Sequence, residues 1–176
     1  FPSRSGGAKE SEPYRLYVAH ILRTEVDSIM NIRSHPQAII MGDFNDYPTN
    51  QSILKILKAE APPVKTNDLA STTDSANAST VTPSSLKLYH LLARKAKSKN
   101  FGSYKFRGEW GLLDHLIVSG TLLNQSNHFF TSEEKANVCL LPFLLKDDEK
   151  YGDKEPFRTY KGMKYQGGIS DHLPIY

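Results

Sequence analysis

The spacing of apolar residues near the start of the chain predicts a helix followed by a buried strand. Apolar side chains recur at intervals of three and four, at Tyr17, Val18, Ile21, Leu22, Val26, Ile29 and Met30. This spacing places them on one helical face, and Ser11 before Pro13 is a start signal because proline is tolerated in a first turn. His35-Pro36 then ends the helix, and the continuous apolar run over residues 38 to 41 predicts a buried strand.

The rest of the chain alternates shorter elements with polar loops. Residues 48 to 50 supply a turn and a cap for a helix through Ile53 and Leu57, and residues 66 to 85, rich in Thr, Ser, Asn and Asp, predict a long surface loop. We expect a basic helix over residues 85 to 99, with Leu88, Leu91 and Leu92 facing inward. Two strands are predicted at residues 103 to 107 and 112 to 119, joined by a turn at Gly108-Glu109.

The C-terminal part is charged and rich in turns. Residues 146 to 161 mix both charge signs with Tyr and Phe, which suits an ordered loop over a site, and a short strand is expected near residues 173 to 176. A helix, a buried strand and polar loops together predict an α/β arrangement. No internal repeat or linker divides the chain, so residues 1 to 176 are predicted to be a single domain.

Composition sets limits on these predictions. The 176 residues are 39% hydrophobic and 23% charged with a net charge of +3, enough for a globular core but too little charge to establish a nucleic-acid partner. One cysteine, Cys139, excludes an internal disulfide and is expected to be a small buried hydrophobe.

No apolar run in the sequence reaches the roughly 18 to 20 residues that span a bilayer. Because the first residue is Phe1, we expect a processed or truncated product, and a secreted or periplasmic location stays open.

Candidate chemistry gathers at three places where an apolar strand meets a loop. They are Asp43 and Asn45 in Gly42-Asp43-Phe44-Asn45-Asp46, Asp114 in Leu112-Leu113-Asp114-His115, and Asp171 and His172 in Ser170-Asp171-His172-Leu173-Pro174. A lone Asp at such a position is usually a cap or turn former. Loops outside strand ends are where α/β folds place ligands, so three such clusters together favour an active site.

These three blocks resemble, in order and context, the last three signature blocks of the endonuclease/exonuclease/phosphatase superfamily. The superfamily includes pancreatic deoxyribonuclease, abasic-site endonucleases, neutral sphingomyelinases and inositol-polyphosphate phosphatases. The opening Pro2-Ser3-Arg4-Ser5-Gly6-Gly7 and the block Pro156-Phe157-Arg158-Thr159-Tyr160 resemble a bacterial branch of it. The resemblance covers essentially the whole chain and implies an α/β (α+β) fold class, namely half of a four-layer α/β/β/α sandwich of the DNase I-like fold.

The resemblance also implies a role for each residue in hydrolysing a phosphoester with Mg²⁺ or Mn²⁺. Asp43 would align or deprotonate the attacking water and help hold the metal, and Asn45 would donate to a phosphate oxygen. Asp171 would belong to the metal and water network. His172 would face the phosphate as base or transition-state stabiliser, with its ring held by Asp114. A hard cation and hydrogen-bond donors are what an anionic phosphodiester requires.

Two further residues are candidates for substrate binding. Trp110 resembles an aromatic residue that walls the family's site, and plain packing is the alternative. Arg158 could hold a phosphate through its planar guanidinium group, with a surface ion pair as the alternative. His115 follows Asp114 on a strand and should therefore point to the opposite face, so we exclude it.

The resemblance implies that the family's N-terminal half is missing from this chain. That half supplies an Asn, the Glu that is the main metal ligand, and a His or Tyr facing the phosphate. We therefore expect that the isolated chain is nearly inactive, that its partner is the other half of the same fold, and that it exposes a sheet surface.

Two other functions fit part of the sequence. A non-catalytic structural or interaction module fits the absent Glu. A calcineurin-like dinuclear metallophosphoesterase would share Gly42-Asp43 and Asp46, but its upstream Asp-x-His and downstream Gly-Asn-His are absent. Mixed charges over residues 146 to 161 favour a small phosphoester or a short nucleic acid over long duplex DNA.

Overall fold

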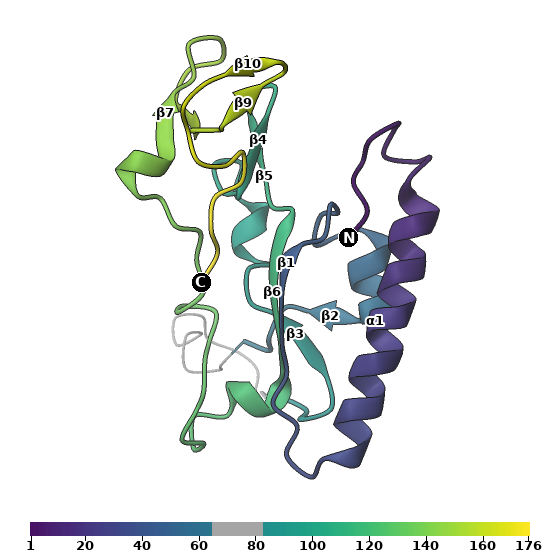
Figure 1. Ribbon diagram of the computed structural model, residues 1–176. Helices are drawn as coiled ribbons and strands as arrows, with labels where there is room; N and C mark the ends of the chain where they lie inside the picture. The colour runs from purple at the N-terminus through teal and green to yellow at the C-terminus, as the bar shows by residue number, and fades with distance from the viewer. Residues whose placement is uncertain (65–82) are drawn as a thin grey trace, which may run out of the picture.

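The computed structural model describes residues 1–64 and 83–176, and these form a mixed α/β structure. α1 (Glu12–Ile32) packs on one side of a four-stranded sheet whose strand order is β1-β6-β3-β2. The strands are β1 (Ile39–Asp43), β2 (Ala59–Glu60), β3 (Leu88–His90) and β6 (Asp114–Ser119). β6 is antiparallel to both β1 and β3, and β2 is parallel to β3. Figure 1 shows α1 on one side of β1 and β6 and the C-terminal segment on the other. The predicted α/β (α+β) class is confirmed.

Alternation along β6 gives the sheet two apolar faces. Ile117 contributes to a cluster that joins the sheet to α1 and to the π-helical turn η1 (Ser52–Leu57). Leu116 and Val118 belong to a second cluster with Leu91, Leu92 and Leu173. Because successive side chains of a strand point to opposite faces, one six-residue strand serves both clusters.

A smaller lobe of hairpins lies beyond one end of the sheet (Figure 1). Antiparallel pairs are formed by β4 (Tyr104–Phe106) with β5 (Glu109–Gly111), by β7 (Leu145–Asp147) with β8 (Lys154–Pro156), and by β9 (Tyr160–Lys161) with β10 (Lys164–Tyr165). Short 3-10 turns are η3 (Lys95–Lys97), η4 (Gly120–Leu123) and η5 (Pro142–Leu144), and η5 leads directly into β7.

The long N-terminal helix is confirmed, but its inward face differs from the predicted one. Tyr17, Ile21 and Ile29 are exposed, whereas Arg15 and Ala19 are buried with Val26 and Met30. The small Ala19 side chain allows a close approach, and Arg15 is turned inward by an ion pair between its Nε and Asp46 Oδ1 at 2.9 Å. A buried ion pair therefore helps to set a rotation that apolar periodicity did not predict.

The predicted burial of residues 38 to 41 is wrong for half of the strand. β1 lies at the edge of the four-stranded sheet, and Ile39 and Met41 are 51% and 56% exposed. Ile40, on the other face, packs against the α1 cluster. The apolar run predicts a strand that is covered on both faces. The described residues cover only the face of β1 that carries Ile40.

The predicted basic helix over residues 85 to 99 is also wrong. Residues Leu88–His90 form β3, which is buried and pairs with both β2 and β6, and only Lys95–Lys97 is helical, as a 3-10 turn. Leu88, Leu91 and Leu92 do face inward. Their spacing satisfies a strand followed by a turn as well as a helix, and tertiary pairing decides between the two.

The predicted hairpin of residues 103 to 107 with residues 112 to 119 is wrong, because the later strand pairs with β1 and β3 instead. The hairpin partner of β4 is β5, and Arg107 and Gly108 form the turn with positive φ values of 52° and 86°. β6 instead joins the main sheet.

Two other predicted segments differ in detail. Residues 146 to 161 include β7 and β8 rather than one loop. The C-terminal residues form isolated bridges, Tyr104 with His172 and Val138 with Ile175, instead of a regular strand. Cys139 is partly buried, and most of the predicted loop over residues 66 to 85 lies outside the described residues.

Candidate functional site

Strand register brings the first two predicted acidic residues together. β1 and β6 pair so that Asp43 lies directly opposite Asp114 at the same end of the sheet. The C-terminal segment reaches this end because the Leu173 amide donates to the Ser103 carbonyl at 2.7 Å and His172 forms a bridge with Tyr104. Ligand atoms of Asp43, Asp114 and His172 all lie within 4.8 Å of one another. Residues 129 positions apart in sequence thus form one cluster.

His172 is held by a carboxylate that has its own hydroxyl partner. The His172 Nδ1 atom lies 2.6 Å from Asp114 Oδ2, and the Ser103 hydroxyl donates to the same oxygen. The Asp114 amide donates to Ser103 Oγ at 3.3 Å. With Nδ1–H donating to the carboxylate, Nε2 is the ring atom left to face a substrate. This confirms the expectation that Asp114 lies within hydrogen-bond reach of His172.

The charges around His172 favour its protonated form. Burial by itself lowers the pKa of the imidazole, but the hydrogen bond from His172 to Asp114 and the negative charges of Asp114, Asp43 and Asp171 outweigh it and raise the pKa above the usual value. A raised pKa increases the fraction of imidazolium near neutral pH. The ring is therefore suited to donating a proton or a charged hydrogen bond.

Asp43 and Asn45 form a compact turn at the end of β1. The Asn45 backbone amide donates to Asp43 Oδ1 at 2.7 Å, and its side-chain amide donates to Asp43 Oδ2 at 2.9 Å. Asn45 has a φ of 51°, a left-handed conformation that asparagine tolerates better than most residues. Phe44 between them is buried in the α1 cluster, so the turn is anchored while Asp43 stays exposed.

Within the cluster, the exposed carboxylate of Asp43 is the group that suits a hard divalent cation, because Asp114 and His172 are hydrogen-bonded to each other. Mg²⁺ is held in many phosphoryl-transfer sites by one or two carboxylates together with water and substrate oxygens. Asp43 is exposed and offers carboxylate oxygens. Asp171 is also exposed but lies outside the cluster of three, and it acts on His172 through its charge.

The two candidate substrate-binding residues have partners outside the cluster. Trp110 is half-buried against the second apolar cluster and lines a hollow of about 180 Å³ with Phe101 and Val138, as the packing alternative expects. Arg158 is partly buried, and its Nη2 atom donates to the Lys105 carbonyl at 3.4 Å. Neither side chain has a contact with Asp43, Asp114 or His172 among the interactions of the described residues.

Sequence reasoning missed a buried polar network beneath the site. Asp46, in the block that holds Asp43, forms ion pairs with Arg15 and Arg4 and accepts a hydrogen bond from Ser52 Oγ at 2.6 Å. It is 1% exposed. Arg4 also donates through Nε to the Asn45 carbonyl at 2.7 Å. The resemblance to Gly-Asp-x-x-Asp drew attention to Asp46, but nothing in the sequence identifies its arginine partners.

Two buried histidines extend this network across the sheet. His115 points away from the site, as predicted, and its Nε2 lies 2.8 Å from the Asp46 carbonyl while its Nδ1 lies 2.6 Å from His90 Nε2. The Leu92 amide donates to His90 Nδ1, so both rings fit a neutral tautomer protonated at Nε2. Burial is the main cause that lowers the pKa of both, to about 4 for His115.

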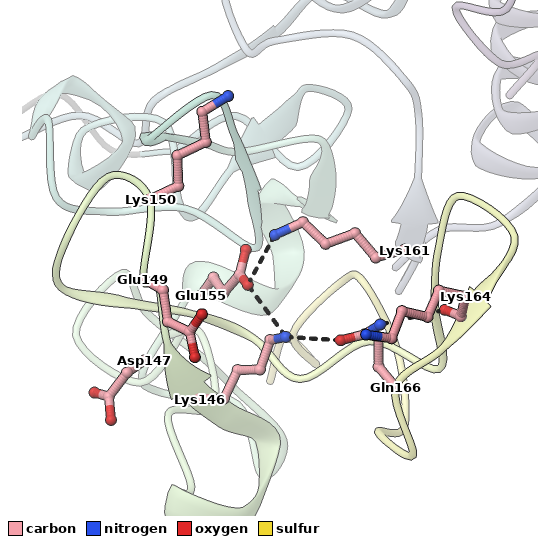
Figure 2. A pocket seen from close by; sticks show the side chains of 8 residues that line it. All are labelled: Lys146, Asp147, Glu149, Lys150, Glu155, Lys161, Lys164 and Gln166. Carbon is pink, nitrogen blue, oxygen red and sulfur yellow. Dashed lines mark hydrogen bonds and ion pairs between the residues drawn. The ribbon is translucent and has the colours of Figure 1, made fainter.

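A polar cavity of about 400 Å³ lies in what we call the hairpin lobe, which comprises the hairpins β4–β5, β7–β8 and β9–β10. Its lysines include Lys146 and Lys161, whose Nζ atoms lie 3.4 Å and 3.3 Å from Glu155 Oε1. Figure 2 shows these two side chains converging on Glu155, with Gln166 beside Lys146. Because Glu155 is almost buried, the network joins β7, β8 and β9. We interpret this network as structural, because it holds β7, β8 and β9 together.

Comparison with known proteins identifies the family of the chain. A family model described as Endonuclease/Exonuclease/phosphatase family matches residues 1–176. The chain belongs to this family. No curated protein and no solved structure matches the chain. The family consists of phosphoesterases and nucleases, which typically use divalent metal ions, so the predicted family and its general hydrolytic class are supported. Within the described residues, no helix is long and apolar enough to cross a membrane.

Proposed function

We propose that this chain supplies the second half of the active site of a phosphoester hydrolase that depends on Mg²⁺ or Mn²⁺. The observation that carries the proposal is the convergence of Asp43, Asp114 and His172 within 4.8 Å, in a chain of this family. The alternative, a non-catalytic module, gives no reason for a carboxylate-bound imidazole with a raised pKa at an exposed strand end.

The roles follow from position and protonation. Asp43 accepts a proton from the attacking water, and the Asn45 side-chain amide holds that carboxylate through one of its N–H groups. The other N–H of Asn45 donates to the Phe1 carbonyl at 3.1 Å and would exchange this acceptor for a phosphate oxygen when substrate binds. The water oxygen bonds to phosphorus as the bond from phosphorus to the leaving oxygen breaks. Protonated His172 donates from Nε2 to a phosphate oxygen and so stabilises the developing charge. The metal ion would polarise the phosphate when bound. Asp43 and Asp171, which are both exposed, would hold it.

Residues 1–176 form one domain in this proposal, which packs against the family's other half. Exposure of Ile39 and Met41 on an edge strand supports such a partner. A Glu from that half would complete the metal site. The mixed charges of the hairpin lobe favour a small phosphoester or a short nucleic acid over long duplex DNA.

The test measures hydrolysis of bis-p-nitrophenyl phosphate by the full-length protein. We expect turnover with Mg²⁺ or Mn²⁺, its loss with EDTA, and a fall of roughly 100-fold or more for Asp43→Asn and His172→Asn. Gln125→Ala, at an exposed position after η4, is the control. Residues 1–176 alone should show little activity. Metal-independent turnover, or none in the full-length protein with metal, would contradict the proposal.

A further inference from the structure

An exposed aromatic strip begins at His172 and continues along β4. The Tyr104 ring lies 4.9 Å from the His172 ring between centroids, and the Phe106 ring stacks on Tyr104 at 6.3 Å with an interplanar angle of 13°. The Arg107 guanidinium group lies over the Phe106 ring, 5.2 Å from its centroid. Phe106 is 58% exposed. We call Tyr104, Phe106 and Arg107 the β4 strip.

The β4 strip is not explained by packing of the described residues. Alternation along β4 points Lys105 inward and the two aromatic residues outward. Lys105 is buried, forms an ion pair with Asp148 at 3.2 Å and donates to the carbonyls of Gly152 and Lys154. The inward side of the strand is therefore fixed to the β7–β8 hairpin. On the outward side a large aromatic ring remains exposed at the tip of a two-residue turn.

We propose that the β4 strip stacks a nucleobase of the substrate, so that the phosphoester next to His172 belongs to a nucleotide or a single-stranded nucleic acid. This inference rests on the proposed function and narrows its substrate class. A flat aromatic ring with an adjacent guanidinium group is what base-stacking sites share. Such a platform accepts an unpaired base, whereas the bases of a duplex are already stacked, and it gives little advantage to a phosphoester without a base.

The first experiment compares two diesters with the same leaving group, thymidine 5′-(4-nitrophenyl phosphate) and methyl 4-nitrophenyl phosphate, using the full-length protein. We expect the ratio of their kcat/KM values to favour the thymidine ester and to fall about 5-fold to 100-fold in Phe106→Ala, with most of the change in KM. Phe106→Trp should keep the preference. The matched control is Phe129→Ala, because Phe129 is 59% exposed and follows η4.

The second experiment measures binding without hydrolysis. Fluorescence anisotropy in EDTA compares labelled oligothymidylate with an abasic oligomer of equal length. Phe106→Ala should weaken the first and spare the second, without changing the salt dependence, whereas Arg107→Gln should lessen the salt dependence. Binding of thymidine monophosphate alone distinguishes a nucleotide site from a strand-binding surface.

Several outcomes would overturn the inference. Equal loss of abasic and base-bearing ligands in Phe106→Ala would do so, as would an unchanged ratio of kcat/KM values. Thermal unfolding supplies another check: a marked loss of stability in Phe106→Ala would mean that another part of the protein covers the ring. Hydrolysis of the methyl ester without base preference would leave the proposed function standing, and base binding without any hydrolysis would refute only that function.

Discussion

At the residue scale, the site depends on how one carboxylate oxygen is shared. Asp114 Oδ2 receives hydrogen bonds from both Ser103 Oγ and His172, and Ser103 is fully buried. A hydroxyl that both donates to the carboxylate and accepts from its backbone amide fixes the rotamer of Asp114. The ring of His172 is then oriented by a group that cannot easily move. Ser103 is thus a positioning residue that the sequence did not reveal.

The raised pKa of His172 leads to a direct prediction. Asp114→Asn removes the negative charge and the charge-assisted hydrogen bond, so the burial of the ring should dominate and the pKa of His172 should fall. An NMR titration of the metal-free protein, following the ring protons, measures this change. Asp147→Asn, at an exposed position in β7, is the control. An unchanged pKa in Asp114→Asn would mean that the hydrogen bond to Asp114 has little influence in solution.

At the element scale, buried histidines connect three segments of the main sheet. His90 on β3 contacts His115 on β6, and His115 contacts the Asp46 carbonyl in the loop after β1. Arg15 brings α1 to the same Asp46 side chain. The segment from Asp43 to Asp46 is therefore attached to α1 by an ion pair and to β6, and through β6 to β3, by hydrogen bonds. Its position does not depend on apolar packing alone.

These histidines predict a loss of stability in mild acid. Burial lowers the folded-state pKa of His115 to about 4 and that of His90 well below its usual value, so both stay neutral while the unfolded chain takes up protons below about pH 6.5. The unfolding free energy should therefore fall as pH decreases from 7 toward 4. His115→Gln should reduce this pH dependence, by an amount on the order of 1 to 3 kcal/mol.

Urea unfolding at several pH values tests this prediction. The slope with pH is the informative quantity, because His115→Gln also changes the stability at neutral pH. His20→Gln, at an exposed position on α1, should keep the original slope. Parallel curves for the original protein and His115→Gln would show that His115 is not protonated on unfolding in this range.

At the scale of the whole molecule, one edge of the main sheet is uncovered by the described residues. β1 is an edge strand, and Ile39 and Met41 project from it on the face opposite α1. An exposed apolar edge strand can pair with another chain. The same surface is available to the other half of the fold in the proposed function.

Residues 1–176 expressed alone should therefore associate through β1. Ile39→Lys combined with Met41→Lys should shift the protein toward monomer, because charged side chains on an edge strand oppose pairing. Sedimentation velocity over a range of concentrations measures the change. Ile32→Lys, which removes an equally apolar but more exposed residue at the end of α1, is the control. The same double substitution should destabilise the full-length protein if that surface is covered there.

Local residue order was enough to predict the candidate site residues and the long N-terminal helix. Asp43, Asn45, Asp114 and His172 were predicted because each lies where an apolar segment meets a loop, a pattern that depends on local residue order. Proline near the start of the helix and a regular apolar spacing act locally, so a helix that begins after Ser11 and ends before His35 follows from the sequence, and the structure has it at Glu12–Ile32.

The pairing of elements and the sharing of partners between groups depend on tertiary contacts. Leu88–His90 became a strand because β2 and β6 offer unpaired backbone groups on both sides, which outweigh local helical spacing. Arg15 faced inward because Asp46, distant in sequence, needed a buried partner. The contact of Ser103 with Asp114 and the β4 strip also depend on strand register. Register is a relation between segments, and a single segment does not encode it.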